Sequence, residues 1–240
     1  NILLSREQRI SYKDKIDINT MNAFKVSIAN VTSFHKKQKP KNYKLSKNGV
    51  KSSILWKPIK SVGLYIPGGT SAYPSSVIMN VIPAKVAGVK RVSVVTPSKF
   101  GEINPYVLAL LDELNIGEIY QVGGAQAIAA LAYGTESIQQ VDKIFGPGNA
   151  YVASAKKQVF GKVGIDLLAG PSEIIVVADE TNNPEWVASD LIAQAEHDKK
   201  AQSILITNDE EFADKVLDFV GKLSIKLPNK EIINESLSNY

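Results

Sequence analysis

The stretch RVSVVTPSKFGEINPYVLALLDELNIGEIYQV, residues 91–122, predicts the fold of this chain. It opens with a β-branched run at 91–96, continues with an apolar helical pattern at 105–114, and closes with a second strand-like run at 118–122. A strand, a helix and a strand in this order are typical of a right-handed βαβ unit, in which the two strands are parallel.

The same alternation continues on both sides of this stretch. We expect further strands and helices at the following positions: strands at 62–66, 143–145, 174–178 and 203–207, and helices at 75–89, 125–133, 150–160 and 184–198. Sheets built from such units are mostly parallel, so the sequence predicts an α/β protein with more than one sheet.

The first 60 residues follow a different pattern. An amphipathic helix is expected at 19–37, because Met21, Phe24 and Ile28 begin an apolar stripe that faces a sheet. A strand is expected at 54–59, and nothing before Asp17 predicts a compact unit.

Composition excludes several classes of site and of location. The 240 residues are 44% hydrophobic and contain no cysteine, which excludes disulfides, thiolate metal sites and thiol nucleophiles. No apolar run approaches the roughly 18 residues of a membrane helix, and no signal-peptide core is present, so we expect a cytoplasmic protein without a membrane partner.

Charge is unevenly distributed along the chain. Residues 1–60 carry a net charge of +11, whereas the other 180 residues carry −7. The lysines between Lys36 and Lys47 form either a solvated face or an anion patch. Because Phe34 and Tyr43 do not continue as a series of stacking aromatics, we expect no nucleic-acid partner.

Four turns next to the predicted strands are rich in glycine and proline: Pro67-Gly68-Gly69, Gly123-Gly124, Gly146-Pro147-Gly148-Asn149 and Ala169-Gly170-Pro171-Ser172. Ligands of open α/β sheets gather at the carboxyl ends of strands, and we expect these turns to line a cleft on one side of a sheet. None of them contains the Gly-x-Gly-x-x-Gly fingerprint of common dinucleotide-binding folds, and no Walker-type motif is present.

Gln194 and His197 are candidate ligands of a metal ion. The chain has only two histidines, and His197 follows Gln194 by three residues in the predicted helix 184–198. Positions i and i+3 are neighbours on a helix surface, so the Gln194 amide oxygen and a His197 ring nitrogen can converge. A histidine near a helix carboxyl end is also typical of capping, and two ligands are fewer than zinc requires.

Several blocks of the sequence, in this order and spacing, resemble histidinol dehydrogenase. The blocks lie between residues 57 and 207: LYIPGG (64–69), YPSSV (73–77), IPAKVAGV (82–89), VGGAQAIAALAYGT (122–135), GPGN (146–149), AGPSE (169–173) and QAEH (194–197). The resemblance implies a zinc-dependent, NAD-linked, four-electron oxidation of L-histidinol to L-histidine through a bound aldehyde, in the last steps of histidine biosynthesis.

The resemblance also implies roles for individual residues. Gln194 and His197 would be metal ligands that also bind the substrate, and Ser172 would contact the substrate. Tyr65, Gln126 and Asn149 match NAD-contacting positions. Glu196 is expected to lie outside the ligand set. The family forms homodimers in which the partner subunit completes the zinc site.

The sequence departs from the family at both ends. The Glu-His acid/base pair and the remaining zinc ligands, an Asp and a His, have no counterpart among these residues and are expected beyond Tyr240. The family's N-terminal opening is also missing. The chain is therefore expected to be the central portion of a longer enzyme and inactive by itself. A non-catalytic nucleotide- or histidinol-binding module is the alternative.

The fold implied by the resemblance is two Rossmann-like parallel-sheet halves, one inserted in the other, without the usual glycine fingerprint. Residues 1–64 and 173–240 would form the first half, incomplete here, and residues 65–172 the second. The native metal is expected to be zinc, with manganese open, because glutamine, histidine and aspartate are a borderline ligand set.

Overall fold

The computed structural model describes residues 2–68, 73–98, 100–168 and 172–239. Contacts divide the chain into two compact units, Asn1–Leu168 (unit 1) and Ala169–Tyr240 (unit 2), and each is described by itself. Residues 2–64 belong to unit 1, because their helices share its apolar core. This division differs from the expected grouping of 1–64 with 173–240, which stays a prediction for the whole protein.

Unit 1 is built on a five-stranded parallel sheet with the strand order β5-β4-β3-β6-β7. The strands are β3 (Ser61–Tyr65), β4 (Arg91–Thr96), β5 (Glu118–Gln121), β6 (Lys143–Phe145) and β7 (Gly164–Ile165). From β3 the chain adds β4 and β5 on one side, and then β6 and β7 on the other. The strand order therefore reverses between β3 and β6, where doubly wound sheets bind their ligands.

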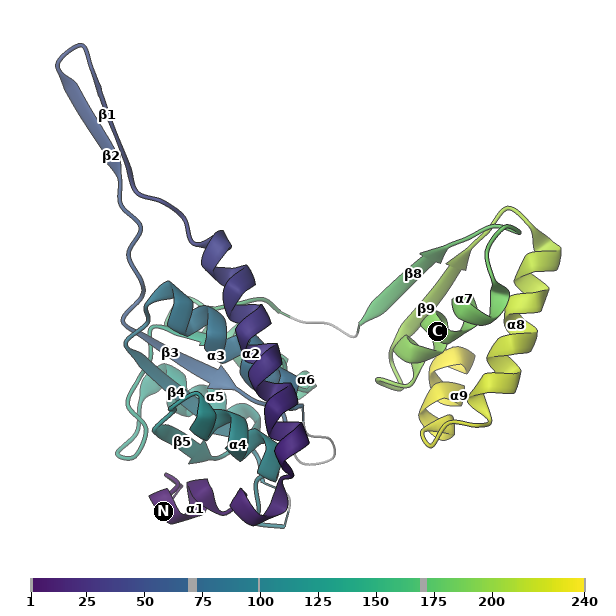
Figure 1. Ribbon diagram of the computed structural model, residues 1–240, viewed down its shortest axis with the longest axis horizontal. Coiled ribbons are helices and arrows are strands. Elements are labelled where there is room, and N and C mark those ends of the chain that lie inside the picture. Colours follow the sequence, from purple (N-terminus) through teal and green to yellow (C-terminus); the bar gives the residue numbers. More distant parts are fainter. Residues whose placement is uncertain (1, 69–72, 99, 169–171, 240) are drawn as a thin grey trace. The chain divides into compact units, whose positions relative to one another are not determined.

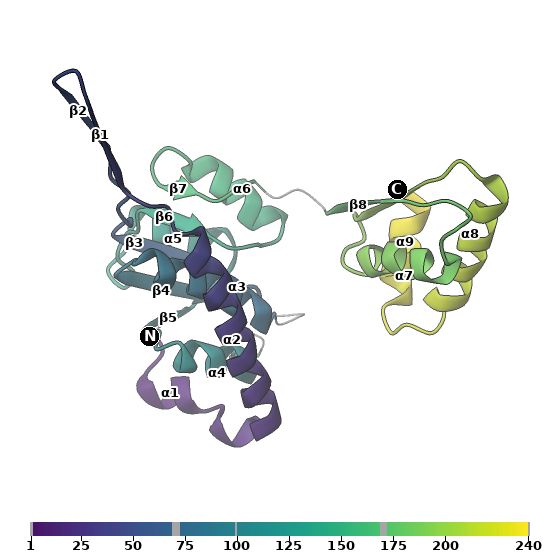
Figure 2. The same cartoon turned by 45° about the horizontal axis from the view of Figure 1, so that its top comes forward.

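Helices cover both faces of this sheet (Figures 1 and 2). They are α2 (Ile18–Gln38), α3 (Pro74–Ala87) and α4 (Pro105–Glu113) on one face, and α5 (Gly124–Tyr133) and α6 (Ala150–Val159) on the other. Successive strand residues serve opposite cores: Leu64 packs with α3 and α4, and Tyr65 with α5 and α6. Since both faces are covered, every residue of β3 is buried, as is typical of parallel sheets.

The N-terminal residues pack against the rest of unit 1, which the sequence pattern did not indicate. Helix α1 (Arg6–Ile10) begins with a capping box in which Ser5 and Gln8 each bind the other's backbone amide. A 3-10 turn, η1 (Lys13–Lys15), follows. Leu3 pairs antiparallel with Tyr120, so the N-terminal segment covers the outer edge of β5.

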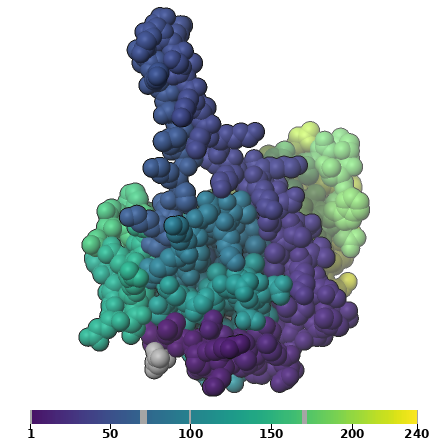
Figure 3. Space-filling view, turned by 60° about the vertical axis from the view of Figure 1, so that its left-hand side comes forward, coloured from purple at the N-terminus to yellow at the C-terminus, as the bar shows by residue number. Residues whose placement is uncertain are grey.

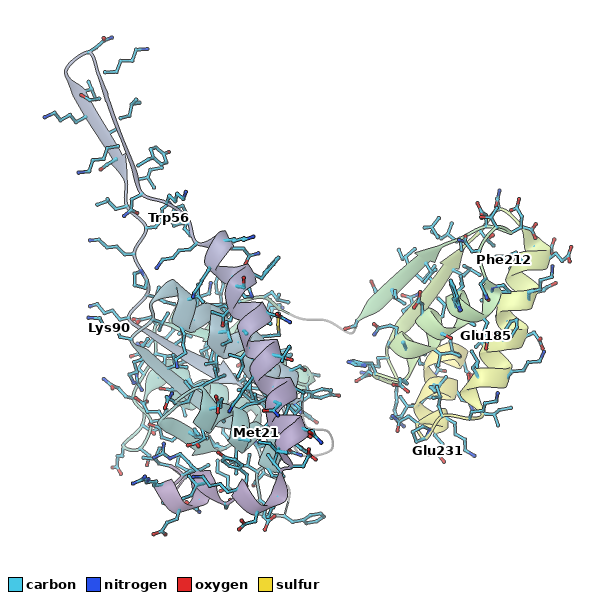
Figure 4. All side chains as sticks on the ribbon, viewed as in Figure 1. Met21, Trp56, Lys90, Glu185, Phe212 and Glu231 are labelled. Atoms are coloured by element: carbon cyan, nitrogen blue, oxygen red, sulfur yellow. The ribbon has the colours of Figure 1, made fainter. Side chains whose placement is uncertain are left out.

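A hairpin of β1 (Tyr43–Lys47) and β2 (Val50–Ile54) projects from unit 1, and all ten of its strand residues are exposed (Figures 1 and 3). Figure 4 places Trp56 at its base. The strand expected at 54–59 was wrong, because pairing ends at Ile54. The turn at Asn48 and Gly49 has positive φ at both residues, the conformation that Asn-Gly favours in a two-residue hairpin.

Unit 2 pairs two parallel strands, β8 (Glu173–Val177) and β9 (Gln202–Ile206), through α7 (Pro184–Ala195). Two further helices, α8 (Glu210–Ser224) and α9 (Lys230–Asn239), complete its core, in which Phe212 and Ile233 are buried. The α/β prediction is confirmed, and the predicted strands from residue 62 onward match observed strands to within one residue at each end. None of the described helices is long and apolar enough to cross a membrane.

Candidate active site

The carboxyl edge of the unit 1 sheet carries three of the predicted glycine turns. They follow β3, β5 and β6 as Pro67-Gly68, Gly123-Gly124 and Gly146 to Asn149, whereas Gly69 lies outside the described residues. The fourth turn was expected on the same side. Ser172 instead lies directly before β8, at the amino end of a strand in unit 2, and residues 169–171 lie outside the described part.

Tyr65, at the end of β3, ties two of these turns together. Its ring is 4% exposed, and its hydroxyl oxygen accepts a hydrogen bond from the Gly124 amide at 3.1 Å. Its carbonyl oxygen lies against Gly146, where an added Cβ would be only 2.1 Å away. Tyr65 therefore fixes the start of α5 and the turn after β6 next to the point where the strand order reverses.

Gln126 and Asn149 lie on the two helices that begin at this edge. Gln126 is exposed in the first turn of α5, and its Oε1 atom would be 2.9 Å from a Cβ on Gly124, so glycine leaves room for this side chain. Asn149 is the N-cap of α6, where its side chain accepts a hydrogen bond from the Val152 amide at 3.2 Å. The amino ends of both helices offer amides to an anion.

The predicted NAD positions are thus linked by backbone contacts. Gly124 bonds to the Tyr65 hydroxyl two residues before Gln126, and Gly146 lies against the Tyr65 carbonyl three residues before Asn149. Of the three, Tyr65 is buried, while Gln126 and Asn149 are exposed to solvent.

An ion pair between a buried lysine and a partly exposed aspartate near this edge was not predicted. Lys156 of α6 is 4% exposed and contacts Asp166, and both side chains bind Gly146. A signal was present in the sequence, because Lys156 interrupts the apolar stripe formed by Val152 and Val159 on one side of a helix.

In unit 2 hydrogen bonds that involve the backbone of Ser172 and of His197 link the three residues predicted to bind substrate or metal. Gln194 lies in the last turn of α7, and its Nε2 atom donates a long hydrogen bond of 3.4 Å to the Ser172 carbonyl. The backbone amide of His197 donates to the Gln194 carbonyl at 3.1 Å. The helix ends at Ala195 rather than at residue 198. The hydrogen bond from His197 to Gln194 continues the chain by one more turn beyond this end.

The donor set at this point fits half of a metal centre. With Nε2 bonded to the Ser172 carbonyl, the Gln194 amide oxygen would be one possible donor to a cation, and a ring nitrogen of the exposed His197 would be the other. No group of three or more His, Cys, Asp or Glu side chains with metal-site geometry occurs among residues 2–68, 73–98, 100–168 and 172–239.

Comparisons with known proteins agree on one family. A family model for histidinol dehydrogenase matches residues 1–240. Histidinol dehydrogenase 1 of Nostoc sp. is 53% identical over 219 residues, covering 91% of this chain and 51% of the Nostoc protein. Histidinol dehydrogenase of Rhizobium meliloti is 55% identical over 222 residues, covering 92% of this chain and 51% of that protein.

Solved structures give the same result. The crystal structure of histidinol dehydrogenase from Elizabethkingia anophelis matches with a TM-score of 0.94 and 40% identity, over 99% of this chain and 55% of that one. AldH of Staphylococcus aureus matches with a TM-score of 0.52 and 18% identity, over 91% of this chain and 46% of that one, a likeness of fold alone. The chain spans about half the length of the curated relatives it matches.

Proposed function

Because the chain belongs to the histidinol dehydrogenase family, we propose that the whole protein oxidises L-histidinol to L-histidine in the last steps of histidine biosynthesis. The observation that carries the proposal is the junction of Ser172, Gln194 and His197 at one end of unit 2. These residues are separated by up to 25 positions, yet the fold joins them through hydrogen bonds.

The proposed reaction is a four-electron oxidation. The alcohol carbon of histidinol loses a hydride and its hydroxyl group loses a proton, which gives an enzyme-held aldehyde. Water adds to this aldehyde, and the resulting hydrate loses a second hydride and two protons to give the carboxylate. NAD, when bound, supplies the hydride acceptor, so two NAD molecules are reduced for each histidinol. Tyr65, Gln126 and Asn149 would hold the cofactor at the carboxyl edge of the unit 1 sheet.

Zinc is the proposed metal, one ion per subunit. Gln194 and His197 would hold it, and when bound it supplies a Lewis acid that orients histidinol through its amino and imidazole nitrogens. Ser172 would contact the same substrate. The hydrogen bond from the Gln194 side chain to the backbone carbonyl of Ser172 links the two residues.

The proposed reaction also needs an acid/base group for proton transfer. His35 lies in the last turn of α2, against Phe34, and His197 is assigned to the metal. From the family resemblance, we propose that a Glu-His pair in the rest of the whole protein serves as acid and base, and that a homodimer partner completes the metal site. Location in the cytoplasm stays a prediction.

Absorbance at 340 nm tests the proposal. The whole protein should form about two NADH for each histidinol consumed, and residues 1–240 alone should form none. His197→Ala should abolish turnover, whereas His35→Ala, which removes the other histidine, should leave it unchanged. A whole protein that binds histidinol or NAD without turnover would instead support the non-catalytic module.

A further inference from the structure

Lys156 is a buried cation whose position in the fold needs an explanation. Its side chain is 4% exposed, within the apolar face of α6. A buried ammonium group is costly unless it is paired and hydrogen-bonded. An apolar residue of similar volume at such a position is often as stabilising as a buried ion pair, so core packing alone does not account for the lysine.

The partners of Lys156 converge on one residue. Lys156 Nζ donates to the Gly146 carbonyl at 3.0 Å and forms an ion pair with Asp166. Asp166 Oδ2 in turn accepts a hydrogen bond from the Gly146 amide at 2.9 Å. A single ion pair therefore holds both backbone polar groups of Gly146.

Asp166 is itself anchored to the sheet. It directly follows β7, and its own amide donates to the Ile144 carbonyl at 3.1 Å, which extends the pairing of β7 with β6. Figure 2 shows α6 and β7 beside each other in unit 1. The ion pair thus connects α6, the end of β7 and the turn between β6 and α6.

The backbone conformation of Gly146 sets the direction of the chain between β6 and α6. Its φ is +114°, and a Cβ there would lie 2.1 Å from the Tyr65 carbonyl oxygen. The next residues are Pro147, Gly148 and the N-cap Asn149. Rotating the Gly146 peptide groups would move Asn149 and the first amides of α6, which are the groups facing the proposed cofactor.

We propose that Lys156 and Asp166 are positioning residues for the cofactor: they fix the Gly146 peptide groups, and so hold Asn149 and the amino end of α6 in the geometry that binds NAD. This inference rests on the proposed function. Neither side chain needs to touch the cofactor, because both act through Gly146.

Binding of NADH to the whole protein, followed by fluorescence titration, tests the proposal. Lys156→Met removes the charge and keeps the length of the side chain, and Asp166→Asn keeps an acceptor for the Gly146 amide while removing the ion pair. Both variants should raise the Kd for NADH about tenfold or more and raise KM for NAD more than they lower kcat. Zinc content should be unchanged, because Gln194 and His197 lie in the other unit.

The matched control is the ion pair of Arg91 and Glu118. It joins β4 and β5 of the same sheet with an N–O distance of 3.0 Å, but at the amino edge, where both residues begin their strands. Arg91→Met should lower the unfolding midpoint without changing the Kd for NADH. Hydrogen exchange at the Gly148 and Asn149 amides should accelerate in the Lys156 and Asp166 variants and not in this control.

The possible results distinguish the assignment of the NAD site from the positioning role of Lys156 and Asp166. A wild-type protein that does not bind NADH would refute the cofactor assignment, and this inference with it. If the wild type binds NADH and both folded variants bind it within about twofold as tightly, only the positioning role is refuted. If Lys156→Met does not fold, the result for Asp166→Asn decides.

Discussion

Replacing Gly146 with alanine tests how tightly the turn after β6 packs against β3 at the carboxyl edge of the unit 1 sheet. Gly146 has a φ of +114°, which an L-residue rarely adopts and which costs about 1–3 kcal/mol. The new Cβ would also lie 2.1 Å from the oxygen, 3.0 Å from the carbonyl carbon and 3.1 Å from the nitrogen of Tyr65. These atoms are backbone of the central strand β3, so relief requires moving a strand, and overpacking of this kind costs about 1–3 kcal/mol.

The two contributions predict a loss of about 2–6 kcal/mol in the free energy of unfolding for Gly146→Ala. Gly161→Ala is the matched control, because Gly161 has a φ of +97° but no atom within 4 Å of an added Cβ. It should lose only the backbone contribution of about 1–3 kcal/mol.

Urea unfolding followed by circular dichroism measures both losses. Gly146→Ala should be the less stable variant and should also bind NADH more weakly. Equal losses in the two variants would show that the strand and turn can separate at little cost, and the close packing of Tyr65 against Gly146 would then not constrain the site.

Two further predictions concern single hydrogen bonds in unit 1. Burial, together with the 2.8 Å hydrogen bond to Asp112, raises the pKa of Tyr12 from 10.0 to about 12, so the neutral phenol stabilises the fold fully below pH 10 and this contribution is lost as the pH rises toward 12. Tyr12→Phe should therefore be about 1–3 kcal/mol less stable than wild type near pH 8, with a smaller gap near pH 11, and an equal gap in urea unfolding at both pH values would contradict this. Asn149→Ala removes the α6 cap and should cost about 0.5–2 kcal/mol while weakening NADH binding. Asn104→Ala removes the corresponding cap of α4 and should cost as much stability without changing the affinity for NADH. If both variants weaken NADH binding equally, Asn149 has no specific role in binding the cofactor.

The strands and helices from residue 62 onward could be predicted because each one has its own pattern of apolar residues in the sequence. Strands such as 91–96 are β-branched runs buried on both faces, and the helices between them repeat their apolar positions with helical spacing. The hairpin at Tyr43–Lys47 and Val50–Ile54 lacked that signal, since all its strand residues are exposed. Its Asn48-Gly49 turn was the available clue.

In the candidate site, only the contacts between residues near in sequence could be predicted. Gln194 and His197 lie close together because they are near in sequence at the end of one helix, so spacing indicated the pair. The bond from Gln194 to the Ser172 carbonyl spans 22 residues, and no local pattern contains it. Lys156 was visible as a charge on an apolar stripe, but its partner Asp166 depends on how β7 pairs with β6.

We propose that the end of α7 carries half of a zinc centre that holds the substrate. The zinc content of the purified whole protein measures this, with His35→Ala as the control for loss of a histidine. The wild type and His35→Ala should each contain about one zinc per subunit, and His197→Ala should contain almost none. If a folded His197→Ala variant keeps the zinc content of the wild type, His197 is not a zinc ligand.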